Sequence, residues 1–171
     1  HSFRTDHSDT EILIHGYEEW GLDGLLSRIS GDFAFAIWDE DSGILSLARD
    51  RAGVKPLYFH SENEQFLFGS EIKAILANPL VQREVEPIAM YHYLSFLTTP
   101  APLTMFRGIY KLPAGHAMTV NYTGEIKAWR YWDATPSNKD DLSEVFALSE
   151  SATEEFYIRG IRDRLETVSY T

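Results

Sequence analysis

The stretch of residues 32–38 (DFAFAIW) constrains the fold of this chain more than any other. Side chains alternate between the two faces of an extended strand. Here one face carries two phenylalanines and an isoleucine, and the other carries two alanines and a tryptophan. Because both faces are apolar, we expect a strand that is covered on both sides. Residues 39–43 (DEDSG) predict a turn, and residues 44–48 predict the returning strand of a hairpin.

The remaining patterns predict a mixed set of elements. They indicate helices over residues 10–21, 22–30, 70–77, 87–97 and 154–168, a hairpin of residues 56–60 with 65–69, and a hairpin of residues 116–120 with 126–132. Gly21 is suited to end the first helix, and Ser70 to cap the start of the third. Strands buried on both faces beside helices predict an α+β fold, with helices outside two packed sheets.

Composition argues against several function classes. The chain has 15 Lys and Arg residues and 26 Asp and Glu residues, which gives a net charge of −11. A chain this acidic repels nucleic acids and anionic membranes, so both are disfavoured as partners. The chain has no cysteine, which excludes disulfides, thiolate metal sites and a cysteine nucleophile from these residues. The six histidines lack zinc-protease spacing, and no apolar run approaches the roughly 20 residues of a membrane span. We expect a cytoplasmic protein.

A helix start at residues 8–11 (SDTE) offers one candidate ligand site. Ser8 and Glu11 fit a capping box, in which each side chain satisfies a backbone amide at the helix start. Asp9 fits a different role, because a carboxylate there can hold the ammonium group of an amino-acid ligand while backbone N–H groups hold its carboxylate. The two interpretations are compatible, and the pattern leaves both open.

Residues 48–57 (ARDRAGVKPL) concentrate charges of both signs between two apolar strands. They fit a turn with surface ion pairs, or a site wall or domain interface where arginine binds carboxylates bidentately. The spacing of a phosphate-binding loop is absent. Ser70 lacks the glycines of a nucleophile elbow, so we interpret it as structural. The glycosylation pattern at Asn121 is better explained as a hairpin turn.

Six segments together resemble the class II glutamine amidotransferase domain. They are residues 8–21 (SDTE, then His, Tyr and Trp-Gly), 31–39 (GDFAFAIWD), 47–58 (LARDRAGVKPLY), 68–76 (FGSEIKAIL), 111–116 (KLPAGH) and 130–133 (RYWD). Their order and spacing hold across nearly all of residues 1–133. Within the class, the third segment is most similar to glutamine-hydrolysing asparagine synthetases.

The resemblance implies an Ntn-hydrolase fold, a sandwich of two antiparallel sheets flanked by helices. In the family, the N-terminal cysteine attacks the glutamine amide, its own amino group serves as base, and Asn and Gly groups stabilise the oxyanion. The released ammonia passes to a synthetase domain that uses ATP to activate aspartate. Asp9 matches the family residue that holds the α-amino group of glutamine.

The chain also departs from the family. It lacks the cysteine, the glutamine-binding and oxyanion segments that normally precede residue 8, and the pyrophosphate loop of the synthetase domain. We therefore expect an incomplete N-terminus, with a glutaminase-like domain at residues 1–133, a linker at 134–150 and the first synthetase helix at 151–171. No catalytic, cofactor-binding or metal-binding residue is predicted in this chain. ATP and Mg²⁺ are expected only in the missing synthetase domain.

Three functional hypotheses remain. The chain is part of a glutamine-dependent asparagine synthetase and inactive alone, a non-catalytic binding module that kept the fold, or a relative of β-lactam synthetases. If the first strands are missing, sheet edges and apolar surface around residues 33–38 stay uncovered. Exposed edges pair with other strands, so we expect self-association, strand exchange or a partner that fills the gap.

Overall fold

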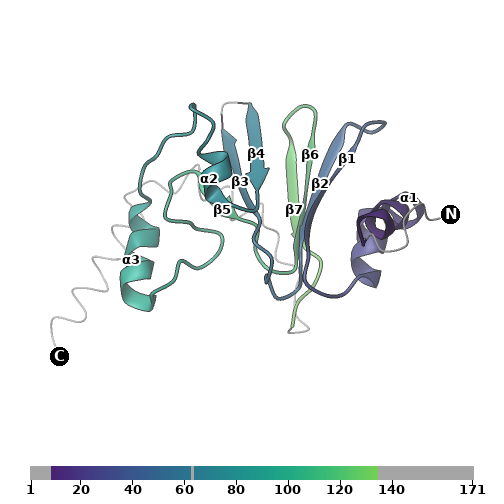
Figure 1. Cartoon of the computed structure of the whole chain (residues 1–171), viewed down its shortest axis with the longest axis horizontal. Helices are drawn as coiled ribbons and strands as arrows, with labels where there is room; N and C mark the ends of the chain where they lie inside the picture. Colours follow the sequence, from purple (N-terminus) through teal and green to yellow (C-terminus); the bar gives the residue numbers. More distant parts are fainter. Residues whose placement is uncertain (1–8, 63, 135–171) are drawn as a thin grey trace.

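Two antiparallel sheets stack face to face between helices (Figure 1). The computed structural model describes residues 9–62 and 64–134. Its elements are α1 (Asp9–Arg28), β1 (Ala34–Asp39), β2 (Ile44–Arg49), β3 (Tyr58–Glu62), β4 (Gln65–Gly69), α2 (Ile72–Ile75), α3 (Pro87–Phe96), β5 (Ile109–Lys111), β6 (His116–Asn121) and β7 (Ile126–Arg130). The strand orders are β1-β2-β6-β7 and β4-β3-β5. The predicted α+β sandwich with flanking helices is confirmed.

Three apolar clusters hold these layers together. The cluster between the sheets is built from Leu47, Leu57, Phe59, Leu112, Met118 and Val120. On the outer face of the larger sheet, Leu26 of α1 packs with Ala48 and Ala117. On the outer face of the smaller sheet, Ile75 of α2 packs with Val81 and Ile109. Each sheet is therefore buried on both faces near its middle, which explains the apolar strands of the sequence.

Helix α1 is broken at Gly21, as the sequence predicts. Gly21 has φ 67° and ψ −178°, a backbone conformation that favours glycine, so two helical segments meet there. The segments pack closely, because a Cβ added to Gly16 would lie 2.7 Å from Cδ1 of Leu25. The break turns the second segment so that Leu25 and Leu26 are buried.

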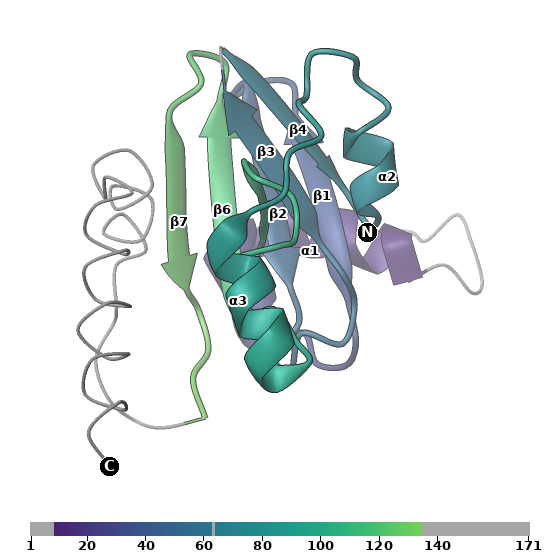
Figure 2. The same cartoon turned by 90° about the vertical axis from the view of Figure 1, so that its left-hand side faces the viewer.

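The expectation that residues 32–38 are covered on both sides is wrong for β1. Trp38 pairs with Leu45 of β2, so its side chain lies on the face that looks toward the second sheet, yet it is 57% exposed. The physical reason is position: β1 is an edge strand, and the second sheet ends at its own edge strand, β4. Figure 2 places β1 and β4 at the same side of the sandwich. Phe68 of β4, which pairs with the core residue Phe59, is also exposed there.

Smaller differences concern helix ends and one short strand. Helix α2 is capped by Glu71 without a side-chain hydrogen bond, so the predicted capping role of Ser70 is wrong. Strand β5 was not predicted, because three residues between Gly108 and Leu112 are too few to show a period. The predicted loop at residues 1–8, the helix at 154–168, and all but the first residue of the 134–150 linker lie outside the described residues. None of the described helices is long and apolar enough to cross a membrane.

Candidate functional site

Asp9, the predicted ligand for the amino group of glutamine, is the first residue of α1. Its side-chain contacts and the predicted cap at Ser8 lie outside the described residues, so both roles stay predictions. Six residues further along the helix, His15 lies between two carboxylates, with Nε2 3.5 Å from Glu11 and Nδ1 3.3 Å from Glu18. Glu11, whose side chain is 14% exposed, lies near the N-terminal end of α1, where the helix dipole favours a negative charge.

Arg49, at the end of β2, does not bind a carboxylate through its guanidinium group. Each of its three guanidinium nitrogens donates to a backbone carbonyl, at 2.7 Å to Lys55, 2.7 Å to Leu112 and 2.6 Å to Gly53. The carboxylate-binding interpretation is therefore wrong for this residue. Its side chain instead ties the loop after β2 to the chain that leads from β5 to β6.

Asp50 is buried, with an exposed fraction of 1%, so the surface ion-pair interpretation is wrong for it as well. Its carboxylate accepts hydrogen bonds from the backbone N–H groups of Ala52 (3.1 Å), Val54 (3.0 Å) and Lys55 (2.9 Å). Burial acts to raise the pKa of Asp50, but these donors together outweigh it and hold the pKa below its usual value. The carboxylate is a buried anion that organises the loop.

The same loop meets the segments KLPAGH and RYWD. The carbonyl of Asp50 accepts from the N–H of Gly115 at 2.9 Å, and the carbonyl of Gly115 accepts from the N–H groups of Tyr131 at 2.9 Å and Trp132 at 3.2 Å. The Tyr131 hydroxyl donates to the carbonyl of Arg49 at 2.8 Å. Three of the six segments that carry the family resemblance therefore form one hydrogen-bonded junction at the ends of β2, β6 and β7.

Burial, with a smaller contribution from Asp50, raises the pKa of Tyr131 to about 12. The hydroxyl therefore remains a neutral donor at physiological pH. Gly115 has φ 68°, and an added Cβ would lie 2.6 Å from the carbonyl oxygen of Trp132. The junction is close-packed backbone, and its side chains are committed to holding it rather than to a reaction.

Lys111 of β5 is a half-buried cation that the sequence did not single out. Its ammonium donates to the hydroxyl of Thr99 at 2.6 Å and to the carbonyl of the same residue. Burial, and then the neighbouring charge of Arg49, lower the pKa of Lys111. The only nearby sequence feature is the Leu-Pro that follows Lys111. It does not indicate that Thr99, twelve residues earlier, is the hydrogen-bond partner.

Two histidines are buried among the residues that the structure describes, and both are hydrogen-bonded to backbone carbonyls. Nδ1 of His60 lies 2.8 Å from the carbonyl of Gly108, and Nδ1 of His116 lies 2.7 Å from that of Ala114. A carbonyl only accepts, so Nδ1 carries the proton in both rings. Within residues 9–62 and 64–134, no three His, Cys, Asp or Glu side chains are placed to hold a metal ion.

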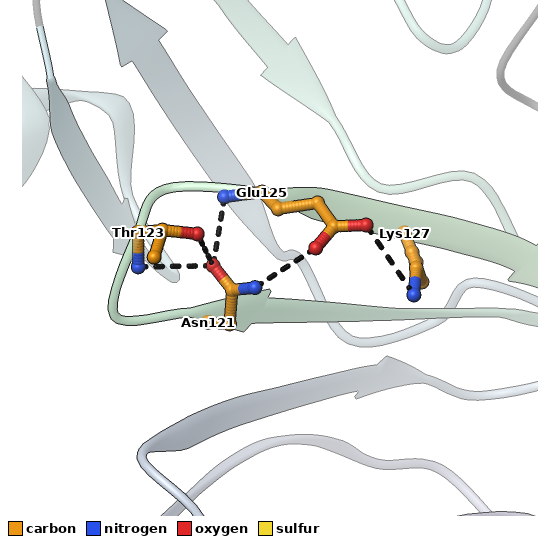
Figure 3. A network of polar contacts seen from close by, with 4 residues as sticks. All are labelled: Asn121, Thr123, Glu125 and Lys127. Atoms are coloured by element: carbon orange, nitrogen blue, oxygen red, sulfur yellow. Dashed lines mark hydrogen bonds and ion pairs between the residues drawn. The ribbon is translucent and has the colours of Figure 1, made fainter.

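Asn121 organises the hairpin between β6 and β7 (Figure 3). Its side-chain oxygen accepts from the N–H and hydroxyl of Thr123 at 3.0 and 2.6 Å, and from the N–H of Glu125 at 2.9 Å. Its amide nitrogen donates to the Glu125 carboxylate at 2.9 Å. The carboxylate in turn lies 3.3 Å from the Lys127 ammonium. The hairpin-turn interpretation of this segment is confirmed.

Comparison with known proteins decides the family. The family profile described as "Glutamine amidotransferase domain" matches residues 1–132. The chain belongs to this family. The amidotransferase domain thus includes all of the structural junction at residues 49–55, 115 and 131–132, and the start of α1.

Relatives of this amidotransferase domain are much longer proteins. Asparagine synthetase [glutamine-hydrolyzing] 3 of Bacillus subtilis is 40% identical over 151 residues, which are 85% of this chain and 24% of that protein. Asparagine synthetase [glutamine-hydrolyzing] 1 of the same organism is 35% identical over 136 residues, 78% of this chain and 21% of the relative. Amidase chry2 of Gibberella zeae is 33% identical over 159 residues, which are 92% of this chain and 22% of that protein. The chain therefore spans about a quarter of the length of these curated relatives.

Among solved structures, glutamine phosphoribosylpyrophosphate amidotransferase of Bacillus subtilis, complexed with ADP and GMP, aligns with a TM-score of 0.50. The identity is 21%, and the alignment covers 77% of this chain and 24% of that one. This likeness supports the Ntn-hydrolase type of sandwich and does not bear on substrate. The fold predicted from the six segments is confirmed.

Proposed function

We propose that this chain is the glutaminase-side part of an asparagine-synthetase-like ligase, in which glutamine hydrolysis supplies ammonia for ATP-dependent amidation of aspartate in the cytoplasm. The observation that carries the proposal is the 40% identity to a glutamine-hydrolysing asparagine synthetase across 85% of the chain. In this arrangement residues 134–150 link to a synthetase domain that begins at residues 151–171. ATP and Mg²⁺ belong to that domain.

Glutamine hydrolysis of this type requires a thiolate that attacks the side-chain amide and a site that stabilises the oxyanion. It also requires a residue that binds the α-amino-acid end of glutamine, called the anchor below. The 171 residues contain no cysteine, so they do not provide the thiolate. We assign the anchor to Asp9, whose carboxylate at the start of α1 would pair with the α-ammonium group. The chain alone is therefore expected to bind glutamine weakly and to hydrolyse none.

The open side of the sandwich supports an added strand. β1 and β4 are both edge strands, and Trp38 and Phe68 are exposed on the faces that look between the sheets. Unpaired strand edges invite pairing. We propose that a further strand pairs there in the working protein, and that the isolated chain associates with itself through the same edges. Light scattering tests this: a monomer at millimolar concentration contradicts self-association.

The decisive experiment uses native protein from the source cells. Its intact mass, N-terminal sequence and glutamate release from glutamine are measured beside those of the 171-residue chain. A cysteine-containing native protein that hydrolyses glutamine, together with an inactive 171-residue chain, supports the proposal. In that native protein, D9N should raise KM for glutamine at least tenfold with little change in kcat, while D41N on the exposed β1–β2 turn should not.

A non-catalytic binding module is the second candidate, because no residue of this chain can serve as the family nucleophile. It predicts that the native protein lacks a cysteine nucleophile and releases no glutamate. Glutamate release by the pure 171-residue chain, with contaminants excluded, would contradict both proposals.

A further inference from the structure

Helix α3 is largely exposed although it carries no charged residue. Its sequence PIAMYHYLSF contains no Asp, Glu, Lys or Arg, and within it only Ala89 is buried. Among the described residues, those of α3 take no part in the three apolar clusters that hold the layers together. Helices of such apolar composition are normally covered by another element. This helix instead lies at the end of the molecule opposite α1 (Figure 1).

The exposed side chains of α3 form one apolar surface. Four of them, at positions 90, 93, 94 and 97, follow the spacing i, i+3, i+4 and i+7, which places them in one stripe that ends at the helix cap. Two more, at positions 91 and 96, flank the stripe. The six residues are 40% to 80% exposed: Met90, Tyr91, Tyr93, Leu94, Phe96 and Leu97.

The size of this surface is that of an interface. A large aromatic side chain presents about 150–250 Å² and an aliphatic one somewhat less, so the six exposed fractions correspond to about 500–700 Å² per chain. The largest apolar patch on a typical monomer is about 300–600 Å². Two such surfaces in contact would bury about 1,000–1,400 Å², which reaches the range of specific protein–protein interfaces.

The N-terminal end of α3 is held firmly. The side chain of Glu86 accepts from the N–H of Ile88 at 3.2 Å, and the backbone N–H of Glu86 donates to the carbonyl of Met105 at 3.0 Å. Val85 forms a β-bridge with Phe106. The helix therefore presents its exposed side chains from a fixed position, which reduces the entropy lost on association.

The negative charge of the chain does not lie around this helix. Residues 76–111 contain three positive and two negative side chains, a net charge of +1, whereas the whole chain has −11. Of the two acidic residues, Glu84 is paired with Arg107 at 3.3 Å, and Glu86 caps the helix. Two copies can therefore meet at α3 without bringing unpaired like charges together, which would oppose contact between acidic surfaces.

We propose that α3 is the contact surface of a two-fold dimer of this chain, in which the stripes of two copies pack antiparallel. Two-fold dimers are the commonest homo-oligomers, and in them the same patch of each copy meets itself. Leu94 lies near the middle of the stripe, so the two copies of this residue are neighbours across the axis. The contact is separate from the β1 and β4 edges, and the inference does not rest on the proposed function.

A single cysteine tests this contact, because the chain has no cysteine of its own. L94C places one thiol at the middle of the stripe. L80C is the matched control, since Leu80 lies on the loop between α2 and α3 and is 69% exposed, against 74% for Leu94. Packed helix axes lie about 8–10 Å apart, and a disulfide requires Cα atoms within about 7 Å. Under mild oxidation of the full 171-residue chain, we expect the disulfide-linked dimer to form at least tenfold faster in L94C than in L80C.

Light scattering of charged variants provides the second test. L94E should lower the average mass of the full chain, because two carboxylates would face each other across the axis, whereas L80E should leave the mass unchanged. An equal mixture of L94E and L94K should recover the mass of the parent chain. Unchanged urea midpoints verify that each variant remains folded.

Three results would each overturn the proposal. The first is a disulfide that forms no faster in L94C than in L80C. The second is a parent chain that remains monomeric at millimolar concentration. The third is an L94E variant with the same mass as L80E, which would assign self-association to the strand edges instead of α3.

Discussion

Replacing Asp50 by asparagine should destabilise the protein strongly, although the side chain changes little in size. The carboxylate accepts three backbone N–H groups inside the protein. Asparagine keeps one acceptor oxygen and turns an NH₂ group toward a buried donor. Hydrogen bonds to a charged group contribute about 1.5–3 kcal/mol each, and a buried donor left without an acceptor costs about 1–3 kcal/mol. With the relief from no longer burying a charge, we expect a loss of about 2–4 kcal/mol for D50N.

Urea denaturation at pH 7 measures this loss as a lower midpoint with an unchanged slope. D41N makes the same chemical change on the exposed β1–β2 turn and should stay within about 0.5 kcal/mol of the parent. A D50N protein that is as stable as D41N would refute the reasoning. Because the pKa of Asp50 is lowered in the folded protein, D50N should also change how stability depends on pH. The stabilising effect of the Asp50 carboxylate is complete above the unfolded-state pKa and disappears as the pH falls through the folded-state pKa, so D50N should flatten the acid limb of the stability curve.

Three further outcomes are expected. G115A should lower the free energy of unfolding by about 2–4 kcal/mol, because the added Cβ would meet the carbonyl of Trp132. G124A is the control: Gly124 also has a positive φ, but an added Cβ would meet no atom, so the loss should be about 1 kcal/mol. Urea denaturation midpoints compare the two variants. N121A should lose about 1 kcal/mol in the same assay, because it removes the acceptor of the β6–β7 turn. Burial lowers the pKa of His116, so the free energy of unfolding should fall as the pH drops below about 6.5, and H116Q should remove that dependence.

Much of the fold is visible in local patterns. The strand at residues 65–69, the break at Gly21, the start of the helix at residue 87 and the turn before β2 all lie where the sequence predicts them. Each depends on neighbours within a few positions: a period of two or 3.6, or a glycine at a positive φ. The hairpin at Asn121 is predicted for the same reason, since its hydrogen bonds join residues at most four apart.

The roles of Arg49 and Asp50 were not predicted correctly, because their environment is set at long range. The guanidinium of Arg49 donates to the carbonyl of Leu112, which is 63 residues further along the chain. The backbone carbonyl of Arg49 accepts from the hydroxyl of Tyr131, which is 82 residues away in the sequence. A run of mixed charges looks the same whether it is solvated or buried. Only the approach of β5, β6 and the end of β7 removes water from this loop and turns its charges into a scaffold.

The amino-acid sequence alone therefore determined the class of fold, most element positions and the family resemblance, because these follow from periodicity and from ordered motifs. The tertiary structure decided which apolar faces are buried. Ala36 and Trp38 of β1 are exposed although the sequence is that of a core strand, and most of α3 is exposed although it has no charged residue. Burial depends on what lies opposite a surface, and that is a property of distant segments brought together rather than of any segment by itself.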